Sequence, residues 1–234
     1  NRKRICANHS VTHLAHKALK MILGDHVAQK GSMVEADRMR FDVSHPKQIT
    51  AEQLRQVEDI VNEQIRYDLP VTTVIMNKEE AVKLGAMALF DEKYGDDVRV
   101  VTMGDENAPF SRELCGGTHV CSTGNIGYFH IVGESAVAAG VRRLECLTGV
   151  GADSYVRETE NKLHHVATTL KTNLNDLEAR INSLLEERKK QEQEIFNLKK
   201  ALASGKSSSD ETETVNGIKF VGKLVSGAHP KELK

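Results

Sequence analysis

The sequence predicts an α+β fold, with a two-layer domain at the start of the chain followed by a long helical coiled-coil arm. Over about the first 150 residues, helical and strand-like segments follow one another without the strict strand–helix repeat of a doubly wound sheet. Residues 152–204 then contain neither proline nor glycine, which is typical of a long helix. The expected parts are a compact domain over residues 1–152, the arm over 153–204, and a linker with the start of a further globular domain over 205–234.

The first predicted elements are a helix and a pair of strands. Apolar residues recur at helical spacing from Ser10 to Ile22, and Gly24 is a typical stop signal. The stretch 27–43 contains Gly31 between extended segments and ends in an apolar–polar alternation, so it predicts a hairpin or paired strands.

Clear signals delimit the next helices and strands. Thr50 and Gln53 form a capping box, and the apolar repeat behind them continues until Pro70 ends the helix. Asn77 is a suitable cap for a short helix that follows a strand. The remaining elements are expected to be strands over 71–76 and 98–103, a loop over 104–112, and strands over 126–132 and 141–148.

The arm carries the apolar seam of a coiled coil. Its positions are separated by alternating steps of three and four residues and comprise Leu174, Leu177, Ile181, Leu184, Arg188, Gln191, Ile195, Leu198 and Leu202. Leu163, Val166 and Leu170 follow a shifted register, which resembles a stutter. Either a second copy of the chain or an internal helical hairpin can cover the seam, so homodimerisation through the arm is one of two expected outcomes.

Composition limits the classes of function. The 32 Lys and Arg residues balance 33 Asp and Glu residues, so any polyanionic partner must be bound by local patches. Apolar runs are far shorter than the about 20 residues that cross a bilayer, which predicts no membrane segment. Four cysteines without a secretory leader are typical of a reducing compartment, so we expect a cytoplasmic protein.

Two histidines in the first helix form half of a candidate metal site. His9 and His13 are four residues apart, so their imidazoles lie on one helix face about one turn apart. A metalloprotease helix requires glutamate directly after the first histidine, and Ser10 occupies that position. By itself, such a pair is more often structural than metal-binding.

The second half of the candidate site is the segment Cys115-Gly116-Gly117-Thr118-His119. A thiolate and an imidazole four residues apart across a flexible Gly-Gly turn are suited to Zn²⁺. Together with the helix, the segment gives the ligand set His9, His13, Cys115 and His119, with Cys121 as a spare ligand. The alternative is an ordinary buried thiol and a core histidine.

Several motifs, in order along the chain, carry a resemblance to a known family. They are His9-Ser10-Val11-Thr12-His13-Leu14, Gln29-Lys30-Gly31-Ser32, Arg40-Phe41-Asp42, Gly85-Ala86-Met87-Ala88-Leu89-Phe90, Glu113 to His119, Thr123-Gly124 and Gly140-Val141-Arg142-Arg143. This pattern resembles the editing domains of the alanyl-tRNA synthetase family over about residues 1–150. The resemblance implies the two-layer editing fold that threonyl- and alanyl-tRNA synthetases share.

The resemblance also implies a function and its residues. The family hydrolyses alanine-specific tRNA wrongly charged with serine or glycine, and its ATP-dependent aminoacylation domains would lie upstream of Asn1. The implied partner is the acceptor end of tRNA(Ala). By position, His9, His13, Cys115 and His119 match the zinc ligands, Gln29, Thr12 and Ser32 match residues of the editing pocket, and Arg142 and Arg143 match a basic pair that binds tRNA.

The chemistry of these residues limits their roles. Gln29 can donate to a carbonyl or orient water but cannot act as a general base, whereas Thr12 and Ser32 can pair with a serine hydroxyl. Arg142 and Arg143 are adjacent on an expected strand and point to opposite faces, which favours Arg142 for a phosphate contact. If all four ligands bind zinc the site is closed and the metal orients the residues; if one leaves, a coordination position opens.

Two other functions are compatible with the same residues. One is a freestanding deacylase of the same superfamily, which the long arm disfavours. The other is a noncatalytic module, stabilised by zinc, that docks tRNA or mediates oligomerisation.

Overall fold

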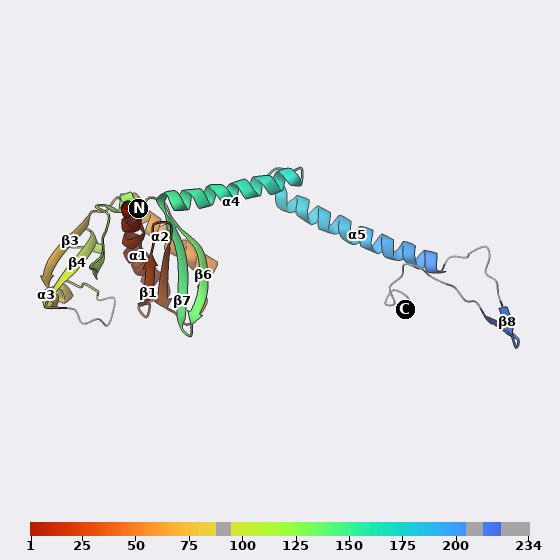
Figure 1. Cartoon of the computed structure of the whole chain (residues 1–234), viewed down its shortest axis with the longest axis horizontal. Coiled ribbons are helices and arrows are strands. Elements are labelled where there is room, and N and C mark those ends of the chain that lie inside the picture. The colour runs from red at the N-terminus through yellow and green to blue at the C-terminus, as the bar shows by residue number, and fades with distance from the viewer. Residues whose placement is uncertain (88–94, 205–212, 221–234) are drawn as a thin grey trace. The chain divides into compact units, whose positions relative to one another are not determined.

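The computed structural model describes residues 1–87, 95–204 and 213–220 (Figure 1). It divides into two compact units, Asn1–Thr159 and Glu160–Lys234, which are described separately. The end of the motif Gly85–Phe90 and the linker expected after Ser204 lie outside the described residues.

The first unit contains two antiparallel sheets and the helices that cover them, which confirms the predicted α+β class. The larger sheet has the order β1-β2-β7-β6, with β1 Gln29–Val34, β2 Met39–Ser44, β6 Phe129–Ala138 and β7 Val141–Thr148. The smaller sheet has the order β3-β4-β5, with β3 Val71–Asn77, β4 Asp97–Gly104 and β5 Pro109–Leu114.

Helix α1 (Arg2–Leu23) is the central element of this unit (Figure 1). Its apolar stripe joins α2 and both sheets in one core whose buried members include Val11, Leu14, Ala18, Leu19, Phe41, Val61, Met103 and Leu144. The helix begins eight residues before the predicted start at Ser10, because the preceding basic and small residues are good helix formers without a breaker. It ends at Gly24, whose φ of 110° suits glycine.

Helix α2 (Ala51–Arg66) has the predicted capping box, in which the Thr50 hydroxyl accepts a hydrogen bond from the Gln53 N–H. Asn62 ties this helix to the larger sheet, because its side-chain amide donates to the Phe129 carbonyl at 2.8 Å and accepts from the Phe129 N–H at 2.9 Å. The helix is thereby fixed against β6.

Two further boundaries differ from the predictions. Residues 104–112, expected as a loop, contain most of β5, which pairs with β4 and leads directly into Cys115. The proline and polar residues of that segment are typical of a loop, but its antiparallel pairing with β4 provides hydrogen-bond partners for its backbone N–H and C=O groups. The strand expected from Ile126 begins at Phe129, after the 3₁₀ helix η1 (Thr123–Ile126). The short helix α3 (Lys78–Lys83) has its expected cap at Asn77.

Two helices occupy the region of the predicted arm. Helix α4 spans Gly149–Thr169 and crosses the boundary between the units, and α5 spans Leu177–Ser204. Between them the backbone turns, with Lys171 at a φ of 52° and the Asn173 side chain accepting from the Asp176 N–H. The predicted stutter is therefore an interruption of the helix.

The apolar seam of α5 is exposed in the single chain, with Ile195 and Leu198 more than half accessible. The coiled coil therefore remains a prediction. Beyond α5, β8 (Glu213–Val215) and β9 (Ile218–Phe220) form a hairpin. Among the helices of the described ranges, none has the length and apolar character needed to span a bilayer.

Candidate metal centre

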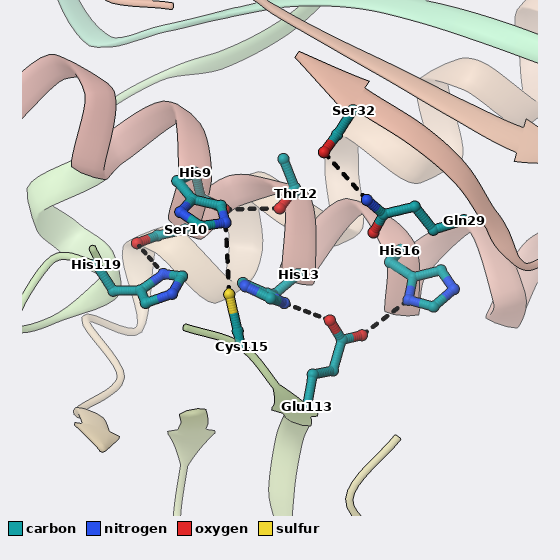
Figure 2. A network of polar contacts seen from close by, with 10 residues as sticks. All are labelled: His9, Ser10, Thr12, His13, His16, Gln29, Ser32, Glu113, Cys115 and His119. Atoms are coloured by element: carbon teal, nitrogen blue, oxygen red, sulfur yellow. Dashed lines mark hydrogen bonds and ion pairs between the residues drawn. The ribbon is translucent and has the colours of Figure 1, made fainter. Parts of the chain in front are cut away.

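The four predicted ligands come together although two segments of the chain more than 100 residues apart supply them. Helix α1 places His9 and His13 on the same face, and the segment after β5 brings Cys115 and His119 against that face (Figure 2). One nitrogen or sulfur atom from each residue lies within 4.8 Å of those of the other three. Four ligand atoms this close together can coordinate one metal ion.

The imidazole nitrogens are disposed as metal ligation requires. His13 Nδ1 contacts the Glu113 carboxylate, and His119 Nδ1 lies 3.2 Å from the Ser10 hydroxyl (Figure 2). The Nε2 atoms of His13 and His119 are buried and have no hydrogen-bond partner among the described residues. A buried polar atom without a partner is costly, and binding a metal at Nε2 would satisfy both rings.

The glycines of the Cys115–His119 segment make room for the histidines. A Cβ atom at Gly117 would lie 1.8 Å from Cε1 of His9, so only glycine fits there without displacing the ring. A Cβ atom at Gly116 would meet no atom within 4 Å. Arg99 on β4 holds the same loop by donating to the carbonyls of Cys115, at 3.2 Å, and of Gly117. The sequence gives no local signal for this role of Arg99.

The electrostatics of the cluster favour a thiolate. Burial alone would raise the pKa of Cys115, but the adjacent imidazoles of His119, His13 and His9 stabilise its thiolate and lower the pKa to about 3. Burial alone would lower the pKa of His13, but its interactions with the Cys115 thiolate and the Glu113 carboxylate outweigh burial and raise it. Cys115 is therefore already ionised at neutral pH, as a metal-ligating thiolate must be.

Glu113 and His16 complete the site, and neither of them was assigned a role from the sequence. The Glu113 side chain is 1% exposed and contacts Nδ1 of both His13 and His16, the latter at 2.8 Å. Burial alone would raise its pKa, but its hydrogen bonds and charge interactions with the two histidines lower it, so Glu113 is a carboxylate. The available signal was the spacing of His9, His13 and His16 along one helix face.

The three predicted pocket residues belong to α1 and to the neighbouring strand β1. Gln29 and Ser32 point toward one another from β1, with Gln29 Nε2 donating to the Ser32 hydroxyl at 3.1 Å (Figure 2). Thr12 lies on α1 and donates its hydroxyl proton to the His9 carbonyl at 2.7 Å. The Thr12 oxygen is therefore left as an acceptor only.

Both arginines of the predicted basic pair are engaged in ion pairs on β7. Arg142 binds Glu134 through two guanidinium nitrogens, and Arg143 binds Asp42 at 2.7 and 2.8 Å. Glu134 lies on β6 and Asp42 on β2, the two strands that flank β7. Because both arginines are paired with carboxylates, neither is a free cation. Cys121, the predicted spare ligand, is exposed and lies outside the four-residue ligand group found in the described residues.

Replacing Gly117 by alanine is expected to lower metal affinity at least about tenfold, because the new Cβ displaces His9 from its position in the ligand set. The matched control is Gly116→Ala, which has space for the added methyl group and should bind metal as the unaltered chain does. Competition for Zn²⁺ with a chromogenic chelator measures both variants. Equal affinities for the two variants would contradict the assigned role of His9.

Comparisons with known proteins agree with the motif pattern. Residues 98–145 match the family described as "Threonyl and Alanyl tRNA synthetase second additional domain". Over its whole length the chain is 51% identical to an alanine–tRNA ligase of Chelativorans sp. (strain BNC1) and 52% identical to one of Mesorhizobium japonicum. An alanine–tRNA ligase of Rhizobium johnstonii is 50% identical. The chain spans 27% of the length of each of these relatives.

Proposed function

We propose an editing function for this chain, which along its whole length corresponds to a segment of alanine–tRNA ligases. The reaction is hydrolysis of the ester bond in tRNA(Ala) wrongly charged with serine or glycine. The observation that carries the proposal is the convergence of four ligand atoms within 4.8 Å, two of them from rings whose Nε2 is buried without a partner. Pocket residues with suitable hydroxyl and amide groups lie on the same helix and on the strand packed against it.

Zn²⁺ fits the donor set best, because three imidazoles and one thiolate are its preferred ligands in tetrahedral sites. His9, His13, Cys115 and His119 would hold it. Bound there, the ion would fix the positions of α1 and the Cys115–His119 loop and supply positive charge beside the reacting ester. Glu113 and Ser10 keep the imidazole rings of His13 and His119 oriented.

The chain's own residues can perform most of the hydrolysis of an ester that is already activated. Gln29 has one amide N–H bound to Ser32, so its second N–H can donate to the ester carbonyl and its Oε1 can hold a water. This orients the attack and stabilises the developing negative charge on the carbonyl oxygen. A glutamine cannot take up the proton, which must pass to water or to the leaving ribose oxygen.

Thr12 is suited to recognise serine. Because its proton is donated to the His9 carbonyl, its oxygen can only accept, and the serine hydroxyl is a matching donor. Alanine would leave this oxygen unpaired and would be hydrolysed less well. Glycine, which is smaller, leaves room for a water at that place.

The arginines are proposed to contact the tRNA near the pocket. Both ion pairs use Nε and Nη2, so Nη1 of Arg142 and of Arg143 takes no part in these pairs and can donate to a phosphate. The further proposals for this chain are the acceptor end of tRNA(Ala) as partner, a homodimer through the exposed seam of α5, and a cytoplasmic location.

The test is deacylation by the purified, zinc-loaded chain. Serine-charged tRNA(Ala) should lose its amino acid faster than in buffer and faster than alanine-charged tRNA(Ala). If the chain binds zinc and tRNA but serine is released no faster than in buffer, the noncatalytic docking module is the better description and the proposal is wrong.

A further inference from the structure

A cavity that none of the assigned roles uses adjoins the metal centre. It has a volume of about 690 Å³ and is lined by Arg2, Lys3, Cys6, His119, Val120, Cys121 and Asn125. His119 is the only one of these residues that also belongs to the ligand cluster. Gln29, Thr12 and Ser32 do not line it, so it is distinct from the predicted amino-acid pocket.

The charge of this cavity favours an anion. Arg2 and Lys3 are its charged lining residues, and it has no acidic one. In the described part of the chain neither cation takes part in an ion pair, whereas the neighbouring Arg4 is paired with Asp37 at 3.1 Å and does not line the cavity. Two unpaired cations at a concave surface are suited to phosphate groups.

The rest of the lining suits a nucleoside. Cys6, Val120 and Cys121 provide an apolar and polarisable wall against which a flat base can pack. The Asn125 amide has both donors and an acceptor for a base edge. The volume lies within the range of about 300–1,000 Å³ that is usual for small-ligand pockets, which is sufficient for one nucleotide.

We infer that this cavity binds one nucleotide of the single-stranded 3′ end of tRNA, adjacent to the nucleotide that carries the amino acid. Its phosphate contacts Arg2 and Lys3, its base packs on Cys6, Val120 and Cys121, and Asn125 pairs with the base edge. The inference rests on the proposed function, because a nucleotide held against His119 places the following, aminoacylated nucleotide at the metal centre.

Direct binding of RNA tests the inference without any hydrolysis. The probe is a fluorescently labelled tetranucleotide, ACCA, which has the CCA end common to tRNAs, and the protein is the zinc-loaded chain. The double variant Arg2→Ala/Lys3→Ala should bind it roughly tenfold more weakly at low salt. The slope of log affinity against log salt should fall in magnitude by about 0.7, since Arg2 and Lys3 contact one phosphate and each neutralised phosphate on a single strand contributes about 0.7. The matched control is Arg4→Ala, which removes a neighbouring cation outside the cavity and should change affinity less than about twofold.

Two further measurements show where ACCA binds and whether the cavity recognises the nucleoside as well as the phosphate. ACCA should slow alkylation of Cys6 and Cys121 by N-ethylmaleimide in the unaltered chain, as read by mass spectrometry, because both free thiols line the cavity. Cytidine monophosphate should displace the probe at least about tenfold better than inorganic phosphate does.

Three results would overturn the inference. They are equal loss of affinity in the double variant and in Arg4→Ala, unchanged alkylation of both thiols in the presence of bound ACCA, and equal competition by phosphate and cytidine monophosphate. Because none of these measurements uses an aminoacyl ester, the inference and the proposed deacylation can fail independently.

Discussion

Replacing Cys115 by alanine is expected to lower the affinity of the chain for Zn²⁺ by roughly two to three orders of magnitude. Cys115 is the one thiolate of the ligand group, and its pKa of about 3 means that it binds metal at neutral pH without losing a proton. Structural zinc sites supply about 10–16 kcal/mol, so one ligand of four accounts for about 2.5–4 kcal/mol.

The matched control for this variant is Cys121→Ala. Cys121 is only six residues further along the chain, but it is exposed and lies outside the ligand group. Elemental analysis after dialysis against a chelator should therefore find about one zinc per chain in Cys121→Ala and much less in Cys115→Ala. If both variants keep zinc equally, the assigned ligand set is wrong.

The second large effect is expected for Glu113→Gln. The buried carboxylate accepts from Nδ1 of both His13 and His16, and an amide has only one acceptor oxygen with which to replace it. Loss of such an orienting partner typically lowers metal affinity about 10- to 100-fold. In the metal-free variant, one of these two histidines then has a buried Nδ1 without an acceptor. This should lower the free energy of unfolding by about 1–3 kcal/mol.

The pH dependence of this loss follows from the two pKa shifts. The pKa of Glu113 is below its ordinary value of 4.5 in the folded chain, so its contribution is complete above that pH and is lost as the pH falls. The pKa of His13 is above its ordinary value of 6.5, so its contribution is complete below that pH and is lost as the pH rises through the folded pKa. The difference between the metal-free unaltered chain and Glu113→Gln should therefore be largest between pH 4.5 and 6.5.

Denaturant titrations of the metal-free chains at several pH values measure this difference. Glu145→Gln is the surface control, because Glu145 is 41% exposed and pairs with Arg40 across β2 and β7. Its effect should stay within about 0.5 kcal/mol at every pH. A Glu113→Gln effect that is equally small would show that the buried carboxylate does not hold the two histidines.

Local signals were sufficient to predict much of the first unit. The capping box at Thr50 and the asparagine cap at Asn77 are determined by neighbouring residues, and both are present in the structure. Likewise, the four-residue spacing of His9 and His13 places both rings on one face wherever the helix lies. Such features depend on backbone geometry that a few consecutive residues fix.

Contacts between distant segments were not predictable from the sequence. Glu113 meets His13 and His16 across 100 and 97 residues, and no local pattern reports that a strand residue will be buried beside a helix. The alternation of β7 indicates that Arg142 and Arg143 point to opposite faces, but it does not reveal that Glu134 and Asp42 pair with them. The strand β5 was missed for the same reason, since its partner β4 is what makes it a strand.

The most direct test of a zinc-organised editing site is a titration of the metal-free chain with Zn²⁺, with the rate of serine release from serine-charged tRNA(Ala) measured at each step. The rate is expected to rise in proportion to bound zinc and to reach its maximum at one zinc per chain. A full rate in the metal-free chain, or no release above the buffer rate at one zinc per chain, would contradict this expectation.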